Sequence, residues 1–454
     1  MVKKIILLTV LFASLYSKAQ LNPAITSFLQ NNSTTGTYYV SGNSTAMSNG
    51  ILVNCQKVEY SSTNVYIHTK GIPAYPTGPF LDGNPSVASN QSAIFQIPLK
   101  PEQNTGTPTA TVPGNIGIFI NGVALFDYRD GVAWNNTTGA LCGGPGNSPC
   151  PGGMGATQAW NRDAIPAEKA GFDCSKGHPA MGNYHHHQNP SAFNLDLSVI
   201  STICNLYDAD GLYTIDSTKH SPLIGFAYDG FPIYGAFAYK NIDGTGGIVR
   251  MKSSYNLSTK TTRANGPDIN KVVGTQTFFN GYFREDYIYK LTSANTPDYL
   301  DSHNGRFCVT PEYPKGIYCY FATVDAKWNS AYPYAVGPTF YGVYANRKVT
   351  SVSETTTVYT PSASIPSDKD LNQFKVNIFP NPSSDFIAIQ ILGLNRENLK
   401  IELFDITGKM VQQSNINAGA TNTYLDTKTL YEGTYLVKIT GPMVSSTQKV
   451  VITK

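Results

Sequence analysis

Apolar and polar residues alternate most regularly in residues 372–454. An alternation with a period of two is typical of strands that bury one face. It predicts strands in Phe374–Phe379, Phe386–Ile391, Leu399–Phe404 and Tyr435–Ile439. Asp405–Lys409 is predicted to be a hairpin turn in which glycine supplies a positive φ. So many short strands in so short a segment predict a small Ig-like β-sandwich.

A longer block before this segment is also predicted to be β-rich. Strands are expected around Lys57–His68 and Asn115–Asn121, and Asn121-Gly122 is a turn-forming pair ahead of a return strand, Val123–Phe126. A glycine- and proline-rich loop follows from Thr137 to Gly155, and a short helix is expected between Trp160 and Ala170. The fold class is therefore mainly β, with a large domain ahead of the small sandwich.

The two ends and one polar stretch divide the chain. In residues 1–19, Lys3 and Lys4 precede an apolar run, and a small-x-small cleavage pattern ends before Gln20, which predicts a signal peptide. Residues 351–371 are rich in Ser, Thr and Pro and are predicted to be a linker. The expected organisation is a signal peptide (1–19), a large domain (20–350), a linker (351–371) and a small domain (372–454).

Composition limits the partners of the mature chain. Removal of residues 1–19 takes three lysines from the 33 basic residues and leaves 30 basic against 30 acidic. Only 14% of residues are charged and there is no basic block, which argues against nucleic acid as a partner. Beyond the signal sequence, no apolar stretch has the length of a transmembrane segment. An exported protein, secreted or at the cell surface, is expected.

Seven cysteines in an exported chain favour disulfides over catalytic thiols. Cys142 and Cys150 bracket the glycine-rich loop and are placed to close it. Cys174, Cys204, Cys308 and Cys319 are further candidates, whose pairing the spacing does not determine. For Cys55 and Cys319, a buried free thiol is an equally weighted alternative.

Histidines supply the candidate chemistry. His185 and His187 are two positions apart, so an extended backbone would place both imidazoles on one face and His186 on the other. Two such rings can reach one metal ion, with His178 as a third ligand. Imidazole ligands suit zinc, copper, nickel or iron, so ligand type alone does not identify the metal. Export and abundant tyrosine favour copper, and zinc needs no redox partner, so the expected cofactor is a divalent transition metal, copper or zinc. The alternative is that these histidines are hydrogen-bonded within a polar core.

Several other residues are candidates for the surroundings of this site. Tyr184 and His186 lie in the same run, and Asp229 and Tyr234 lie in a second aromatic segment. Asp229 could orient a histidine through its second ring nitrogen, or could simply form a turn with Gly230. Arg162 and Asp163, in the predicted helix, are candidates for contact with a substrate. No nucleophile elbow, phosphate-binding loop or HExxH motif is present, so whether the protein is an enzyme stays open.

The histidine region resembles the YHYH domain family. Tyr184-His185-His186-His187 stands at the family's defining run, with His186 in place of its second tyrosine, and residues 225–235 (GFAYDGFPIYG) match another of its signatures. Residues 304–314 and 331–334 are similar as well, so the resemblance covers about residues 55–345. In some relatives a second Tyr-His-Tyr-His run appears, whereas residues 318–321 (YCYF) lack both histidines. The resemblance implies no particular activity.

The last segment resembles the type A C-terminal sorting domain of the type IX secretion system of Bacteroidetes. The similarity lies in residues 379–382 (FPNP), 402–408 (ELFDITG), 433–439 (GTYLVKI) and the terminal lysine. It implies that the type IX secretion machinery recognises this domain and that the mature protein is released or anchored at the cell surface.

Three functional hypotheses remain open on the sequence. The first is a secreted or cell-surface metal-binding protein. The second is a glycan- or surface-binding module whose contact surface is formed by tyrosines and by Trp134, Trp160 and Trp328. The third is a copper-dependent oxidoreductase. Substrate, reaction and oligomeric state are not encoded in any recognisable motif.

Overall fold

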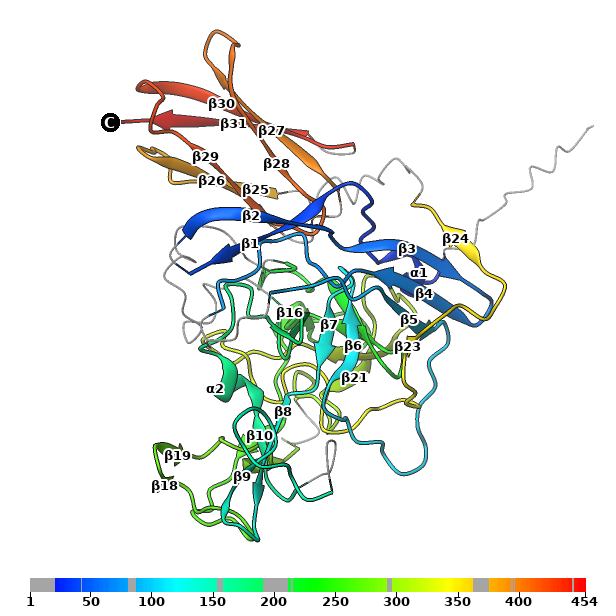
Figure 1. Cartoon of the computed structure of the whole chain (residues 1–454). Coiled ribbons are helices and arrows are strands. Elements are labelled where there is room, and N and C mark those ends of the chain that lie inside the picture. Colours follow the sequence, from blue (N-terminus) through cyan, green and yellow to red (C-terminus); the bar gives the residue numbers. More distant parts are fainter. Residues whose placement is uncertain are drawn as a thin grey trace, which may run out of the picture.

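The computed structural model describes residues 21–41, 43–80, 87–152, 158–190, 211–213, 215–291, 296–361, 375–392, 395, 397–442 and 445–454. The predicted signal peptide, Cys204 and residues 362–371 of the predicted linker lie outside the described residues. Strands dominate throughout, and the strands of the last segment gather at one end of the molecule (Figure 1). The mainly β fold class is confirmed.

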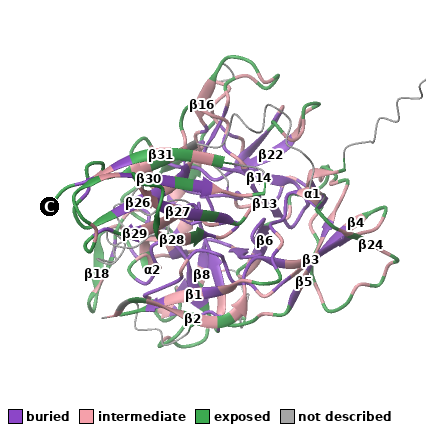
Figure 2. Ribbon diagram, turned by 90° about the horizontal axis from the view of Figure 1, so that it is seen from above, coloured by how far each residue is buried: buried purple, intermediate pink, exposed green. Residues whose placement is uncertain are grey.

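An eight-stranded mixed sheet forms the centre of the large domain. Two of its pairs, β12 with β7 and β14 with β22, are parallel, and the others are antiparallel. In spatial order its strands are β11 (His178–Ala180), β12 (Asn183–His186), β7 (Ala124–Phe126), β6 (Asn115–Phe119), β13 (Leu223–Ala227), β14 (Pro232–Tyr234), β22 (Ile317–Phe321) and β21 (Gly305–Cys308). Figure 2 shows much of β6, β13 and β14 as buried, as expected for the middle of a covered sheet.

A five-stranded antiparallel sheet packs beside it. Its order is β23 (Lys348–Val349), β5 (Ala93–Pro98), β4 (Asn64–Thr69), β3 (Cys55–Tyr60) and β24 (Thr357–Tyr359). The sequence predicted one strand over Lys57–His68, whereas the chain turns at residues 61–63 and forms the β3–β4 hairpin. The hydroxyl of Ser61 accepts from the backbone N–H groups of Thr63 and Asn64, which explains the reversal.

Part of the predicted linker also differs from expectation. Thr357–Tyr359 form β24, which pairs with β3 at the edge of the five-stranded sheet. The β-branched residues of this segment favour an extended backbone. Just before it, the carboxylate of Glu354 accepts hydrogen bonds from Asn64 and from the hydroxyl of Tyr66. The first part of the stretch is therefore attached to the large domain.

Short elements complete the large domain. The helices are α1 (Pro23–Thr26), α2 (Ala164–Glu168) and the 3₁₀ turn η3 (Arg284–Asp286). The remaining strands are β1 (Thr35–Val40), β2 (Asn43–Leu52), β8 (Arg129–Asn135), β9 (Ala140–Cys142), β10 (Asn161–Asp163), β15 (Phe237–Tyr239), β16 (Ile248–Arg250), β17 (Tyr255–Leu257), β18 (Lys271–Val273), β19 (Gln276–Phe278) and β20 (Tyr287–Tyr289). Helix α2 lies inside the region where a helix was predicted.

The cysteines follow the sequence expectation in part. Cys142 and Cys150 form a disulfide that closes the glycine-rich loop, as predicted. Cys174 is also disulfide-bonded. Cys308, a disulfide candidate, is a buried free thiol. Cys55 and Cys319, for which a buried free thiol was the alternative, are also free and buried.

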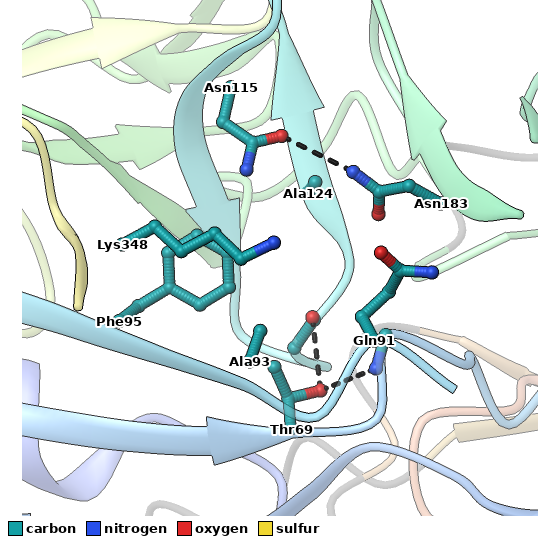
Figure 3. A pocket seen from close by; sticks show the side chains of 10 residues that line it. Thr69, Gln91, Ala93, Phe95, Asn115, Ala124, Asn183 and Lys348 are labelled. Atoms are coloured by element: carbon teal, nitrogen blue, oxygen red, sulfur yellow. Dashed lines mark hydrogen bonds between the residues drawn. The ribbon is translucent and has the colours of Figure 1, made fainter. Parts of the chain in front are cut away.

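The Asn121-Gly122 turn joins the two large sheets. As predicted, it connects the antiparallel strands β6 and β7. Gly122 has a φ of +78°, and a Cβ placed there would lie 2.3 Å from Thr69 Oγ1 on β4. The hydroxyl of Thr69 donates to the carbonyl of Gly122 at 3.1 Å and accepts from the backbone N–H of Gly71 at 2.9 Å (Figure 3). Only glycine combines this backbone conformation with so close an approach.

Residues 375–454 form two facing sheets. One contains β25 (Lys375–Phe379), β26 (Phe386–Leu392) and β29 (Asn422–Asp426), and the other contains β28 (Met410–Ile416), β27 (Leu399–Asp405), β30 (Gly433–Thr440) and β31 (Ser445–Ile452). Ile389 from the first sheet and Ile401, Val437 and Ile439 from the second belong to one buried cluster. This arrangement agrees with the predicted β-sandwich, and Gly408 has the predicted positive φ of +86°.

Among the described residues, no helix has both the length and the apolar character needed to cross a membrane.

We expect Gly122→Ala to destabilise the large domain more than Gly131→Ala does. Gly131 also has a positive φ, +82°, but a Cβ there would meet nothing within 4 Å. The control should therefore lose about 1–2 kcal/mol from backbone strain, and Gly122→Ala roughly 1–3 kcal/mol more from overpacking against Thr69. Denaturant unfolding followed by tryptophan fluorescence measures both, since all three tryptophans lie in this domain. Equal losses would contradict the structural role given to Gly122.

Candidate metal centre

Three imidazoles converge at the edge of the eight-stranded sheet. His178 on β11 is directly opposite His185 on β12, and His187 follows two positions later on the same face. The Nε2 atoms of His185 and His187 are 3.1 Å apart, and those of His178 and His187 are 3.5 Å apart. One ligand nitrogen from each ring lies within 4.8 Å of the other two. The predicted sharing of a face by His185 and His187 is therefore present in the structure.

Backbone carbonyls fix the orientation of two of these rings. His185 Nδ1 lies 2.8 Å from the carbonyl oxygen of Asn183, and His187 Nδ1 lies 2.6 Å from that of Asp127. A carbonyl oxygen only accepts hydrogen bonds, so each Nδ1 must carry the proton and donate it. In the neutral rings the lone pair is then on Nε2. Both lone pairs therefore point into the space between the three rings.

The spacing of the nitrogens suits a single ion. Zinc–imidazole bonds of about 2.0–2.1 Å place the ligand atoms of a tetrahedral ion about 3.3 Å apart. The two measured Nε2 separations, 3.1 and 3.5 Å, lie on either side of this value. The neighbouring groups that hold Nδ1 are those typical of metal-binding histidines. The residues present thus fit a divalent transition metal.

The site is enclosed by apolar and aromatic groups. His178, His185 and His187 are 5%, 1% and 4% exposed. Phe126 stacks on His185 with ring centroids 3.7 Å apart, and Phe172 packs edge-on against His178. Burial, followed by the proximity of His187 and His178, lowers the pKa of His185 well below its usual value. His185 is therefore neutral at ordinary pH, which is the form that binds metal.

A carboxylate that the sequence did not single out lies beside the histidines. Glu168 is the last residue of α2, and its Oε2 is 3.3 Å from His178 Nε2 and 3.2 Å from His187 Nε2. Burial acts to raise the pKa of Glu168, but the interactions with His178 and His187 outweigh it and the net pKa is lowered. Glu168 precedes His178 by ten residues, and nothing in that spacing indicates contact. One feature of the sequence could have indicated this contact: Glu168 is the only glutamate within twenty residues of His185–His187.

Arg162 and Asp163 support the helix that carries Glu168. Asp163 Oδ1 accepts the backbone N–H of Ile165 at 2.9 Å and so caps the start of α2. Its other oxygen accepts the hydroxyl of Tyr334 at 2.6 Å. Arg162 forms an ion pair with the buried carboxylate of Asp130. These contacts occupy both side chains within the protein and fix the position of α2.

Tyr184 and His186 point away from the three imidazoles. His186 Nε2 is 2.7 Å from the hydroxyl of Tyr75, and its Nδ1 is 3.1 Å from the carbonyl of Lys176. Tyr184 donates its hydroxyl to Asp173 Oδ2 at 2.8 Å. Both rings are fully buried and hydrogen-bonded in the core. They support the sheet from the opposite face.

The second family signature, residues 225–235, lies several strands away from the histidines in the same sheet. Asp229, in the β13–β14 turn, accepts hydrogen bonds from Tyr320 and from the backbone N–H of Gly342, whereas Tyr234 on β14 contacts Thr310. Strand β14 is four positions from β12 in the sheet, or about 19 Å at the usual strand spacing. The structure therefore does not bring Asp229 or Tyr234 to the histidines.

The remaining histidines in the downstream part of the chain have other partners. His220 Nδ1 is 2.7 Å from the carbonyl of Ser221, and its ring packs against Tyr234 and Tyr239. His303 Nδ1 is 3.0 Å from the carbonyl of Thr339. Neither ring joins the group around His185.

Fold and site together define a mainly β protein with a buried histidine cluster at the edge of its central sheet. Residues 94–333 match the family model described as YHYH protein, and the chain belongs to that family. Residues 377–453 match the secretion system C-terminal sorting domain. A search of the curated proteins finds no match. Both resemblances seen in the sequence are thereby confirmed.

The stability of the folded protein should depend on pH through Asp163, the residue that caps α2. Burial raises the pKa of Asp163 to about 8. The folded chain therefore keeps a proton that the unfolded chain releases near its ordinary pKa of about 3.9. Stability from this group is fully present below pH 4 and is lost as the pH rises towards 8.

Asn cannot ionise and is also a good N-cap. We expect the thermal midpoint of Asp163→Asn, relative to the wild type in the presence of a chelator, to rise steadily from pH 4 to pH 8. Asp268→Asn, at an exposed position, should not show this trend. Parallel curves for wild type and Asp163→Asn would contradict the assignment.

Proposed function

We propose that this YHYH protein binds one divalent transition metal, copper or zinc, through Nε2 of His178, His185 and His187. The observation that carries the proposal is the convergence of these nitrogens while two Nδ1 atoms donate to backbone carbonyls. Three protein nitrogens are a common basis for zinc and copper sites in proteins.

Electrostatics supports a cation in this place. With both Nδ1 atoms protonated, the Nε2 lone pairs of His185 and His187 face one another at 3.1 Å. A proton or a metal ion between them relieves the repulsion, and burial disfavours a positive charge on the imidazole of His185. A metal ion satisfies all three rings at once, whereas a single proton bridges only two. The geometry therefore suits a metal better than a hydrogen-bonded core.

The sequence also raised a glycan- or surface-binding module built on tyrosines and the three tryptophans. Trp134 is buried with Phe278 and Phe283, and Trp160 packs against the same cluster and donates its indole N–H to Ala264. Trp328 packs against the main core. Trp134 and Trp160 share one interior cluster and Trp328 belongs to another, so the three rings form no common contact surface. No structural observation favours this alternative over metal binding.

The sorting domain gives the location. It supports export by type IX secretion and indicates release from the cell or attachment to its surface. A metal site in that setting meets the extracellular metal pool. We propose that the protein works outside the cell, with the signal peptide and the sorting domain acting in sequence during export.

Metal analysis tests the proposed function directly. Full-length protein without a histidine tag, incubated with Zn²⁺ or Cu²⁺ and then desalted, should retain about one ion per chain. The His185→Ala/His187→Ala double variant should retain none, because it loses two of three ligands. An ion at 100 times its Kd should also stabilise the wild type by about 2.7 kcal/mol.

The matched control is His220→Gln/His303→Gln, which also removes two histidines but leaves the cluster intact. It should bind metal as the wild type does. The proposal is wrong if the wild type and His185→Ala/His187→Ala retain the same amount of metal.

Export can be tested in the native host. Deletion of residues 372–454 should leave the protein inside the cell envelope, because the secretion machinery no longer has its recognition domain. Immunoblots of culture medium, cell surface and envelope fractions measure this. Unchanged delivery of the truncated chain to the surface or medium would contradict the role of the domain.

A further inference from the structure

The carboxylate of Glu168 lies beside two of the three imidazoles. Its Oε2 is 3.3 Å from His178 Nε2 and 3.2 Å from His187 Nε2, the same range as the separations between the ring nitrogens. Ligand atoms around one tetrahedral ion are expected about 3.3 Å apart. We propose that Glu168 is the fourth ligand and that it makes the centre a closed structural site; this inference rests on the proposed metal binding.

Charge supports Glu168 as the anionic ligand. Three neutral imidazoles supply no negative charge to a buried divalent cation, and an uncompensated buried charge is costly. Two other acids nearby already have a cationic partner, since Asp127 pairs with Arg129 at 2.6 Å and Asp130 pairs with Arg162. Asp173 accepts a hydrogen bond from Tyr184, which points away from the three imidazoles. In the described part of the chain, the titratable side chains in contact with the Glu168 carboxylate are His178 and His187. It is therefore the acid available to balance a metal ion.

Burial indicates which side of the centre Glu168 closes. Its side chain is 25% exposed, whereas those of His178 and His187 are 7% and 3% exposed. The imidazoles thus line the inner wall and the carboxylate lies on the solvent side. Four protein ligands with no position left for water are typical of structural zinc sites, whereas catalytic sites keep one position open.

The elements that carry the ligands indicate which parts of the fold a bound ion would link. Glu168 ends α2, whose start is fixed by Asp163, and the histidines belong to the β11–β12 hairpin and the residue after it. A shared ion would tie the helix to the edge of the central sheet. The cation would then act as a structural link between the two elements and not as a Lewis acid for a substrate.

Cobalt(II) with azide as an added ligand tests this inference. Co²⁺ reports its coordination through its visible spectrum, and azide enters the coordination sphere only where a position is open. Wild-type protein loaded with one Co²⁺ should show a spectrum that azide leaves unchanged. Glu168→Ala should bind Co²⁺ at least 10-fold more weakly, since even groups around the ligands contribute about 10- to 100-fold. Its spectrum should change on azide addition.

Two further variants complete the test. Glu102→Ala removes an exposed acid of the same domain and should behave as the wild type. Glu168→Gln keeps the size of the side chain and serves if Glu168→Ala fails to fold; it should also admit azide. Wild-type Co²⁺ protein that takes up azide as readily as the Glu168 variants would overturn the closed site while leaving metal binding intact. Wild-type protein that binds no Co²⁺, Zn²⁺ or Cu²⁺ would remove the proposed function itself.

Discussion

The hydrogen bonds from imidazole Nδ1 to backbone carbonyls determine what this site can do. The carbonyls of Asn183 and Asp127 accept from His185 and His187, and this leaves Nε2 of both rings as the atoms that face the centre. Rotation of either ring would cost a buried hydrogen bond, of the order of 1 kcal/mol or more. The ligand set is therefore oriented before any ion arrives, as expected for a site on rigid elements.

The fold supplies those carbonyls from two directions. Asn183 belongs to the same strand as His185, whereas Asp127 follows β7, the parallel neighbour of β12. The core on the opposite face, where His186 contacts Tyr75 and Tyr184 contacts Asp173, holds β12 in place. Alternation along one strand thus gives His185 to the site and His186 to the core. The same hairpin presents His178 from β11 directly across from His185.

The alternation of residues along the strands and the turn residues predicted the features that depend on neighbours in the sequence. The His185/His187 relation, the Asn121-Gly122 turn and the strands of the last segment follow from a period of two and from turn chemistry, and all three are present. Glu168 could not be predicted, because its contact depends on how α2 packs against a hairpin ten residues later. Asp229 was expected near the histidines, but the order of strands in the sheet places it elsewhere, and strand order is not written in local periodicity. The β24 pairing was missed for the same reason, since its partner strand lies some 300 residues earlier.

The most direct test is the position of the ion itself. Crystals of metal-replete protein, measured at the absorption edges of zinc and copper, should show one anomalous peak about 2.0–2.1 Å from Nε2 of His178, His185 and His187. An ordered metal-free centre in protein soaked with either ion, with the three rings diverging or each bound to an internal partner, would contradict the account.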